Sequence, residues 1–179
     1  MHSSDVFKIV VGDGWRADMP DEPEPYQEQP SPGVDFSRIR DVVDIVIDGT
    51  SISGRTEEDS VFFLIRDLLF AVEKLTSGNQ TARVSFYEAP WELILQRLGE
   101  KVYITFYRSG RRPQVVTKDY AVSFSSLARG IIVSAKQLVC HAVEYDQAAN
   151  DDPLINTIQT LLTNIQSFHQ KIWKNHDQN

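Results

Sequence analysis

Residues 91–108, WELILQRLGEKVYITFYR, decide the fold class. Two runs of alternating apolar and polar residues, 91–97 and 101–108, flank a short connection that contains Gly99, a pattern typical of an antiparallel hairpin. The alternation predicts an apolar face made by Trp91, Leu93, Leu95, Val102, Ile104 and Phe106. The opposite face carries Tyr103, Thr105 and Tyr107. The hairpin therefore predicts a sheet with one covered face.

Further runs of this kind lie on both sides of the hairpin. Residues 82–88 and 114–124 extend it to a meander, with a break expected near Lys118 and Asp119. Towards the N-terminus, 5–11 and 42–48 also alternate, and the sequence DGT after the second run predicts a turn into a short strand. Because these runs do not alternate regularly with helices, as the strands of a doubly wound parallel sheet do, they favour an antiparallel sheet of about five to seven strands.

Three segments have helical patterns. The first, about 57–76, is expected to begin at a Thr56 N-cap with Asp59 three positions on and to stop at Gly78. The second covers 125–149, and Asp152-Pro153 begins the third, about 153–174. The prediction is a single α+β domain over 1–179, in which one central helix and a C-terminal αα-hairpin pack on the sheet.

The last helix carries an apolar seam with alternating spacings of four and three residues. Its members are Leu154, Ile158, Leu161, Ile165, Phe168 and Ile172, with Trp173 beyond them. Ile155 and Leu162 widen the stripe, which favours burial on the neighbouring helix over a free coiled coil. The alternative is a contact through 154–173 with a partner or a second copy of the chain.

Composition limits the classes of protein. The chain has 179 residues, a net charge of −7 and one cysteine, Cys140, so we expect one domain without an internal disulfide. It contains no apolar run of the ~20 residues that a membrane span needs. The N-terminus shows no secretory signal, which predicts a soluble cytoplasmic protein. The negative charge disfavours nucleic acid as a partner.

An acidic, proline-rich stretch interrupts the strands. Residues 12–33, GDGWRADMPDEPEPYQEQPSPG, hold six acidic residues against one arginine, a net charge of −5. We predict a long loop over 12–40 between two strands of one sheet, because a single strand's worth of chain precedes it. The candidate contacts for a basic partner protein are Asp21, Glu22, Glu24, Tyr26 and Glu28.

No catalytic, cofactor or metal signature is present. The glycines of GDGWRA, residues 12–17, lack the third glycine and the following helix of a dinucleotide loop. Cys140 and His141 are adjacent on a helix and so do not face one another; Cys140 is expected to be a small core residue. Asp44 and Asp48 are expected on a solvated strand face. His169 and His176 lack a third ligand.

A basic hairpin is the other feature with a functional interpretation. RSGRRP, residues 108–113, supplies Arg108, Arg111 and Arg112 beside Tyr107. With Arg97, Lys101 and Lys118 on neighbouring strands, we expect positive charge to gather at one end of the sheet. Bases next to aromatic rings suit single-stranded nucleic acid. The alternatives are a soluble hairpin tip that discourages edge pairing and a docking point for the acidic stretch.

These observations favour binding over catalysis. The leading hypothesis is a non-enzymatic cytoplasmic adaptor, inhibitor or immunity-type protein, which binds a protein with a basic surface through the acidic stretch, the helical seam, or both. Binding of single-stranded nucleic acid through the basic hairpin is the second hypothesis. The third is an enzyme whose site is assembled from residues far apart in sequence and includes Cys140 or His141.

Overall fold

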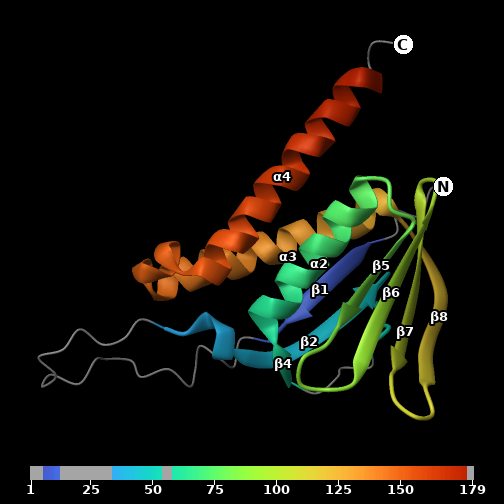
Figure 1. Ribbon diagram of the computed structural model, residues 1–179, viewed down its shortest axis with the longest axis horizontal. Helices are drawn as coiled ribbons and strands as arrows, with labels where there is room; N and C mark the ends of the chain where they lie inside the picture. Colours follow the sequence, from blue (N-terminus) through green and yellow to red (C-terminus); the bar gives the residue numbers. More distant parts are fainter. Residues whose placement is uncertain (1–5, 13–33, 54–57, 177–179) are drawn as a thin grey trace, which may run out of the picture.

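The fold consists of two antiparallel sheets and three α-helices in the part of the chain described, which confirms the predicted α+β class (Figure 1). The computed structural model describes residues 6–12, 34–53 and 58–176, and side chains as far as Ser167. The acidic residues 13–33 therefore lie outside the described residues. Within the described ranges the strands are divided between two sheets of four, where the sequence predicted one larger sheet.

The first sheet is built around β2 (Arg40–Ile47), which pairs with β1 (Phe7–Val11), β3 (Thr50–Ser51) and β4 (Glu58–Ser60). The predicted turn after β2 is present: Asp48 and Gly49 both have positive φ angles, 50° and 80°, as the central residues of a tight hairpin do. One face of the sheet enters the core through Phe7, Ile9, Val43, Ile45 and Ile47.

The second sheet is the predicted meander. Its strands β5 (Thr81–Ser85), β6 (Trp91–Leu98), β7 (Lys101–Arg108) and β8 (Gln114–Ser123) are neighbours in sequence order. Leu93 lies opposite Phe106 and Leu95 opposite Ile104, all fully buried, which confirms the predicted apolar face. The register of β7 with β8 shifts near Phe106, and Asp119 has a φ of 51°, so the expected break in β8 is a bulge.

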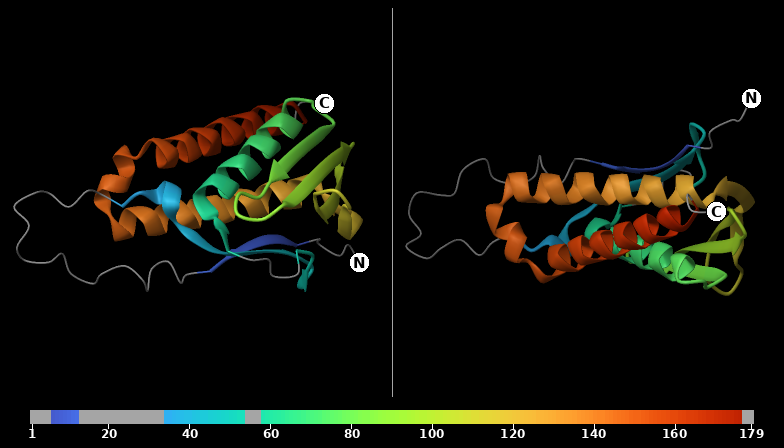
Figure 2. Two further views of the ribbon diagram at one scale, coloured as in Figure 1. Left: turned by 60° about the horizontal axis from the view of Figure 1, so that its bottom comes forward. Right: turned by 90° about the horizontal axis from the view of Figure 1, so that it is seen from above.

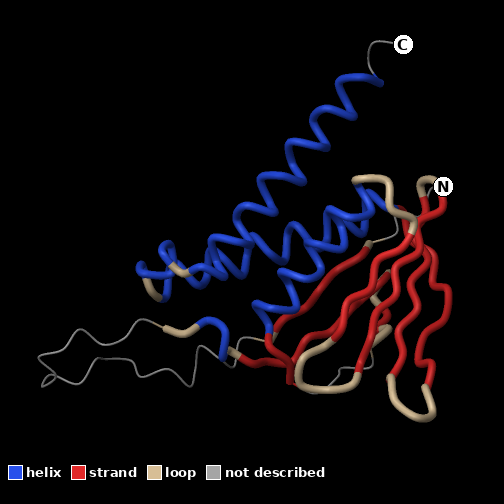
Figure 3. The backbone as a smooth tube through the Cα atoms, in the orientation of Figure 1, coloured by secondary structure: helices blue, strands red, loops and turns tan. Residues whose placement is uncertain are grey.

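The helices cover one side of this sheet, and none in the described residues covers its other face (Figure 3). They are α2 (Val61–Thr76), α3 (Phe124–Tyr145) and α4 (Pro153–His176); the short 3-10 turns η1 (Phe36–Arg38) and η2 (Gln147–Asp151) precede β2 and α4. Helix α3 lies between β1 and α4 (Figure 2). Asp152 caps α4 as predicted, because its Oδ1 accepts the N–H groups of Leu154 and Ile155 at 2.8 and 3.0 Å.

The seam of α4 is largely internal. It packs against both α2 and α3, and its contact with α2 is the more extensive. The buried residues are Ile155, Ile158, Leu161, Leu162 and Ile165. The last turns of α4 continue past the other helices (Figure 1). Phe168, Ile172 and Trp173 lie outside the residues whose side chains the structure describes.

Three predicted boundaries were wrong. Helix α2 begins at Val61, not near residue 57, because Glu58–Ser60 pair with β2 and place Asp59 opposite Asp41. The predicted Thr56 cap lies outside the described residues, and the N-cap is Ser60. The loop expected over 12–40 ends earlier, since η1 and then Arg40 of β2 follow. The helix expected over 125–149 stops at Tyr145.

A close contact joins the outer edge of β1 to α3. The N–H of Phe7 donates to Ser126 Oγ at 3.2 Å, and Ser134 Oγ donates to the carbonyl oxygen of Ile9 at 3.0 Å. Between these two serines, a Cβ on Gly130 would lie 2.3 Å from the carbonyl oxygen of Phe7. The helix can therefore reach the strand only because residue 130 has no side chain.

The substitution Gly130→Ala tests this contact. Alanine favours a helix by about 1 kcal/mol over glycine, whereas overpacking costs about 1–3 kcal/mol. Because the obstructing atom is a backbone oxygen, which cannot rotate away, we expect the upper part of that overpacking range, about 2–3 kcal/mol. The net loss in the free energy of unfolding in urea should then be ~1–2 kcal/mol. Lys136→Ala, at an exposed position of α3, should stay within about 0.5 kcal/mol. A Gly130→Ala protein more stable than the wild type would contradict the close contact.

Candidate functional site

An open groove of about 920 Å³ runs between β1 and α3. We call it the β1–α3 groove; residues 6–11 form one wall and residues of 123–137 the other. Among the residues that line it are Val6, Lys8, Val10, Arg129 and Val133. Its floor is the contact of β1 with Gly130, which the hydrogen bonds of β1 with Ser126 and Ser134 flank. Both walls therefore belong to regular elements that are fixed to each other.

Three valines on these walls are exposed. Val6, Val10 and Val133 retain 42%, 50% and 47% of their accessible surface. Val10 lies on the face of β1 that does not enter the core, Val6 immediately precedes the strand, and Val133 comes from α3. Single exposed valines are ordinary, and three that share one groove provide an apolar surface for a ligand to cover.

Among the described residues, the charges that line the groove have one sign. Lys8 and Arg129 are both exposed, and the lining residues within this part of the chain include no aspartate or glutamate. Within the part of the chain that the structure describes, neither cation forms an ion pair. A locally positive groove on a chain with a net charge of −7 favours an acidic ligand.

Sequence reasoning missed this groove, although a signal for it existed. Ser126, Gly130 and Ser134 are spaced by four residues and so lie on one face of α3. Such a row of small residues indicates a close neighbour along the helix. Nothing in the sequence says that the neighbour is β1, because the two segments are more than 110 residues apart.

A buried carboxylate holds the β5–β6 connection against β4. Asp59 is 1% exposed, and its carboxylate accepts the N–H groups of Ser60 at 2.7 Å and Tyr87 at 3.0 Å. Burial raises the pKa of Asp59, and these hydrogen bonds oppose the rise. Next to it, Glu88 accepts from Ser60 Oγ and forms an ion pair with Arg40 at 3.0 Å. Since backbone donors occupy Asp59, we assign it a structural role.

Tyr87 forms a second polar cluster on the same connection. Its ring stacks on Phe63 with centroids 5.2 Å apart, its O–H donates to Asp67, and Arg66 Nη2 donates to its oxygen at 2.8 Å. Burial and then the Asp67 carboxylate raise the pKa of Tyr87 to about 12. The phenol therefore stays protonated at neutral pH and acts as a fixed donor.

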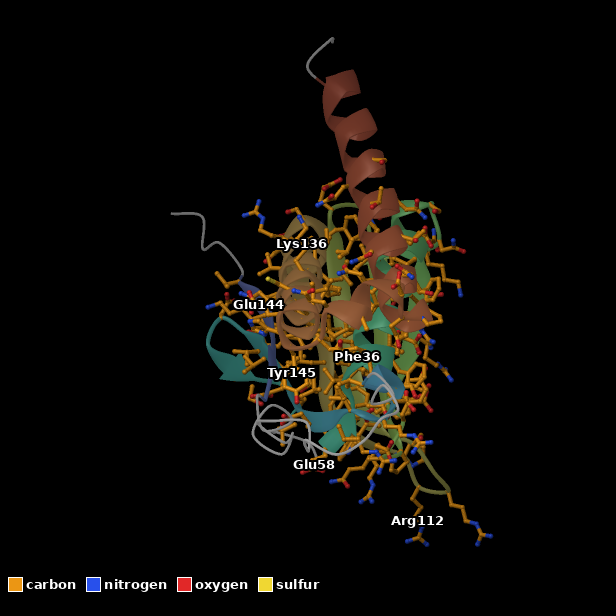
Figure 4. The ribbon with its side chains drawn as sticks, turned by 90° about the vertical axis from the view of Figure 1, so that its left-hand side faces the viewer. Phe36, Glu58, Arg112, Lys136, Glu144 and Tyr145 are labelled. Atoms are coloured by element: carbon orange, nitrogen blue, oxygen red, sulfur yellow. The ribbon has the colours of Figure 1, made fainter. Side chains whose placement is uncertain are left out.

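The basic hairpin is smaller than expected. Arg111 and Arg112 are exposed at its tip, and Arg112 projects away from the body of the protein (Figure 4). The expectation that Arg97 and Lys101 join them was wrong, because Arg108 lies opposite Trp91 whereas Lys101 lies opposite Leu98, at the other end of the sheet.

Two of these side chains are already engaged. Arg97 donates to the carbonyl oxygen of Leu75 at 2.9 Å and lies over the Phe124 ring at 3.8 Å. Tyr107 remains near the tip, but its O–H donates to Glu92 Oε2 at 2.6 Å. This hydrogen bond raises the pKa of Tyr107 and holds its hydroxyl on the sheet.

Two other expectations were wrong. Cys140 is exposed, with its thiol 3.3 Å from Glu144 Oε1, because Leu138, Val139 and Ala142 take the core-facing positions of α3. Lys136, Glu144 and Tyr145 are further exposed residues of this helix (Figure 4). Asp44 is buried and not solvated. Its Oδ1 accepts from the hydroxyls of Ser51 and Ser53, both at 2.6 Å, which joins β3 and the residues after it to β2.

The remaining predicted site residues lie outside the described part of the chain. They are Asp21, Glu22, Glu24, Tyr26 and Glu28, within 13–33, and the side chain of Trp173. Among the described residues, no group of three His, Cys, Asp or Glu side chains is arranged to hold a metal ion.

The raised pKa of Asp59 predicts how stability depends on pH. The folded protein binds the Asp59 proton more tightly than the unfolded chain does. Protonation of Asp59 therefore stabilises the fold at low pH, and this contribution is lost as pH rises through the folded-state pKa. The free energy of unfolding of the wild type minus that of Asp59→Asn should therefore fall from about pH 4 towards neutrality.

Asp35→Asn is the control, because its effect on stability should depend on pH in the opposite direction. Hydrogen bonds from Ser37 lower the pKa of Asp35, so its stabilising effect is present above the unfolded-state pKa and is lost on acidification. Urea unfolding across the same pH range measures both differences. If the difference in free energy of unfolding between the wild type and Asp59→Asn rose with pH, the raised pKa of Asp59 would be contradicted.

None of the helices in the described ranges is long and apolar enough to cross a bilayer. Comparison of the chain with protein-family models, with curated proteins and with solved structures found no match.

Proposed function

We propose that this protein is a non-enzymatic, cytoplasmic protein-binding module, of the adaptor, inhibitor or immunity type, and that the β1–α3 groove is its main contact. One observation carries the proposal: three exposed valines and two cations without ion pairs among the described residues share one groove. A mixed apolar and charged lining is the composition of a protein contact, where buried apolar groups supply affinity and charges supply selectivity.

The rigidity of the walls also supports binding. The hydrogen bonds from Phe7 to Ser126 and from Ser134 to Ile9 hold β1 and α3 in place before a partner arrives. Association then requires little ordering of this protein, which reduces the entropy lost on binding. A partner loses its own conformational freedom only.

The contacts inferred from the sequence stay in the proposal as secondary ones. Residues 12–33 carry the charge for a basic partner surface. A second copy of the chain could use the seam of α4 only past Ile165, since α2 and α3 already cover the earlier part.

A matched pair of variants tests the groove. We expect Val10→Ser/Val133→Ser to reduce the yield of cross-linked partner proteins, identified by mass spectrometry, at least about tenfold, because burying one valine contributes about 1.5–2 kcal/mol. Val115→Ser/Val116→Ser on β8 removes valines that are 53% and 45% exposed far from the groove and should leave the yield unchanged. Equal yields from all three proteins, with unchanged unfolding curves, would refute the proposal.

A second candidate function is binding of single-stranded nucleic acid through the basic hairpin. It is favoured by the exposed Arg111 and Arg112, which have no ion pair within the described residues, next to a sheet face that no described helix covers. The hydrogen bond of Tyr107 to Glu92 weakens it, since a carboxylate beside the ring repels phosphate.

The salt dependence of binding to an oligothymidylate tests this second function. Replacing Arg108, Arg111 and Arg112 with alanine should lower the affinity measured by fluorescence anisotropy. It should also reduce the slope of log affinity against log salt by about 0.7 for each phosphate that an arginine no longer neutralises. Lys101→Ala, at the far end of the sheet, is the control. No binding by the wild type at low salt would exclude this function.

A further inference from the structure

We infer that the occupant of the β1–α3 groove is an acidic segment of a partner protein, bound in an extended conformation. The inference rests on the proposed function for its site and adds the chemistry of the ligand. The ligand is a peptide from another protein. The experiment that follows separates this occupant from a second copy of the chain and from the chain's own acidic residues.

The sign of the charges supports an acidic ligand. Lys8 comes from β1 and Arg129 from α3, so a chain that runs between the walls passes both cations. The described residues that line the groove offer no carboxylate to a basic ligand. Exposed ion pairs contribute only about 0–1 kcal/mol each. The two cations therefore select against basic segments more than they supply affinity.

The spacing of the outward side chains along β1 supports an extended ligand. The floor of the groove closes where Gly130 meets Phe7, so the ligand lies above it and contacts the side chains of the walls. Lys8 and Val10 point outward from β1, and such side chains repeat at about 7 Å along a strand. An extended ligand has the same repeat and can match apolar to apolar and acid to cation.

The ligand would be recognised by its side chains. The outward N–H of Phe7 and the carbonyl oxygen of Ile9 already have serine partners, so strand addition at this edge would have to displace α3. The apolar residues of the ligand face Val6, Val10 and Val133. Its acidic residues face Lys8 and Arg129.

Selection from a random dodecapeptide phage library, with the full chain as bait, tests this chemistry. We expect enriched peptides to have an excess of Asp and Glu at alternate positions with apolar residues between them. The bait Lys8→Glu/Arg129→Glu should lose that excess, and a selected peptide should bind it at least about tenfold more weakly in fluorescence anisotropy. The bait Arg111→Glu/Arg112→Glu, which removes two cations elsewhere, should retain the preference.

The other outcomes are decisive. No enrichment, or enrichment without acidic residues, would refute the acidic ligand; if Val10→Ser/Val133→Ser still lost its cross-linked partner, the proposed function would stand. A dimer in light scattering that dissociates in Lys8→Glu/Arg129→Glu would assign the groove to a second copy. Tighter peptide binding after neutralisation of Asp18, Asp21, Glu22, Glu24 and Glu28 would assign it to the chain's own acidic residues.

Discussion

The contact of α3 with the edge of β1 is the constraint on which the rest of the structure depends. An edge strand exposes unpaired N–H and C=O groups, and a helix can satisfy them only if its own backbone comes close. Gly130 permits that approach, and Ser126 and Ser134 provide the hydroxyl groups on either side of it. Because α3 lies between β1 and α4, the same contact holds both walls of the groove and one of the two helices on which α4 packs.

This way of covering an edge has a consequence for recognition. A bare edge accepts any extended chain through backbone hydrogen bonds, whereas a covered edge leaves only side chains to be read. Two cations and three valines are a small set of contacts, so selectivity must come from rejecting unsuitable ligands. A basic residue of an unsuitable ligand would be buried beside Lys8 or Arg129. Its charge would lose water without gaining an ion-pair partner, and this cost strongly disfavours binding of that ligand.

The sequence predicted the parts of the fold that local interactions determine. Alternation placed Leu93 and Phe106 on one face, and the Asp152-Pro153 pair set the start of α4. It failed where pairing is non-local: β2 draws Glu58–Ser60 into a strand, which shortens α2 at its N-terminal end. The groove was missed for the same reason, since the neighbour of Gly130 is a strand at the other end of the chain.

The charge of the whole chain and that of the groove act at different ranges. Beyond a Debye length of about 8 Å at physiological ionic strength, charges on the surface are largely screened. The net charge of −7 therefore weakly opposes the approach of an acidic segment, and Lys8 and Arg129 attract it only at close range. Association then gains little from electrostatic steering. The lifetime of the complex depends mainly on the valines, which are removed from water only when the ligand is fully seated.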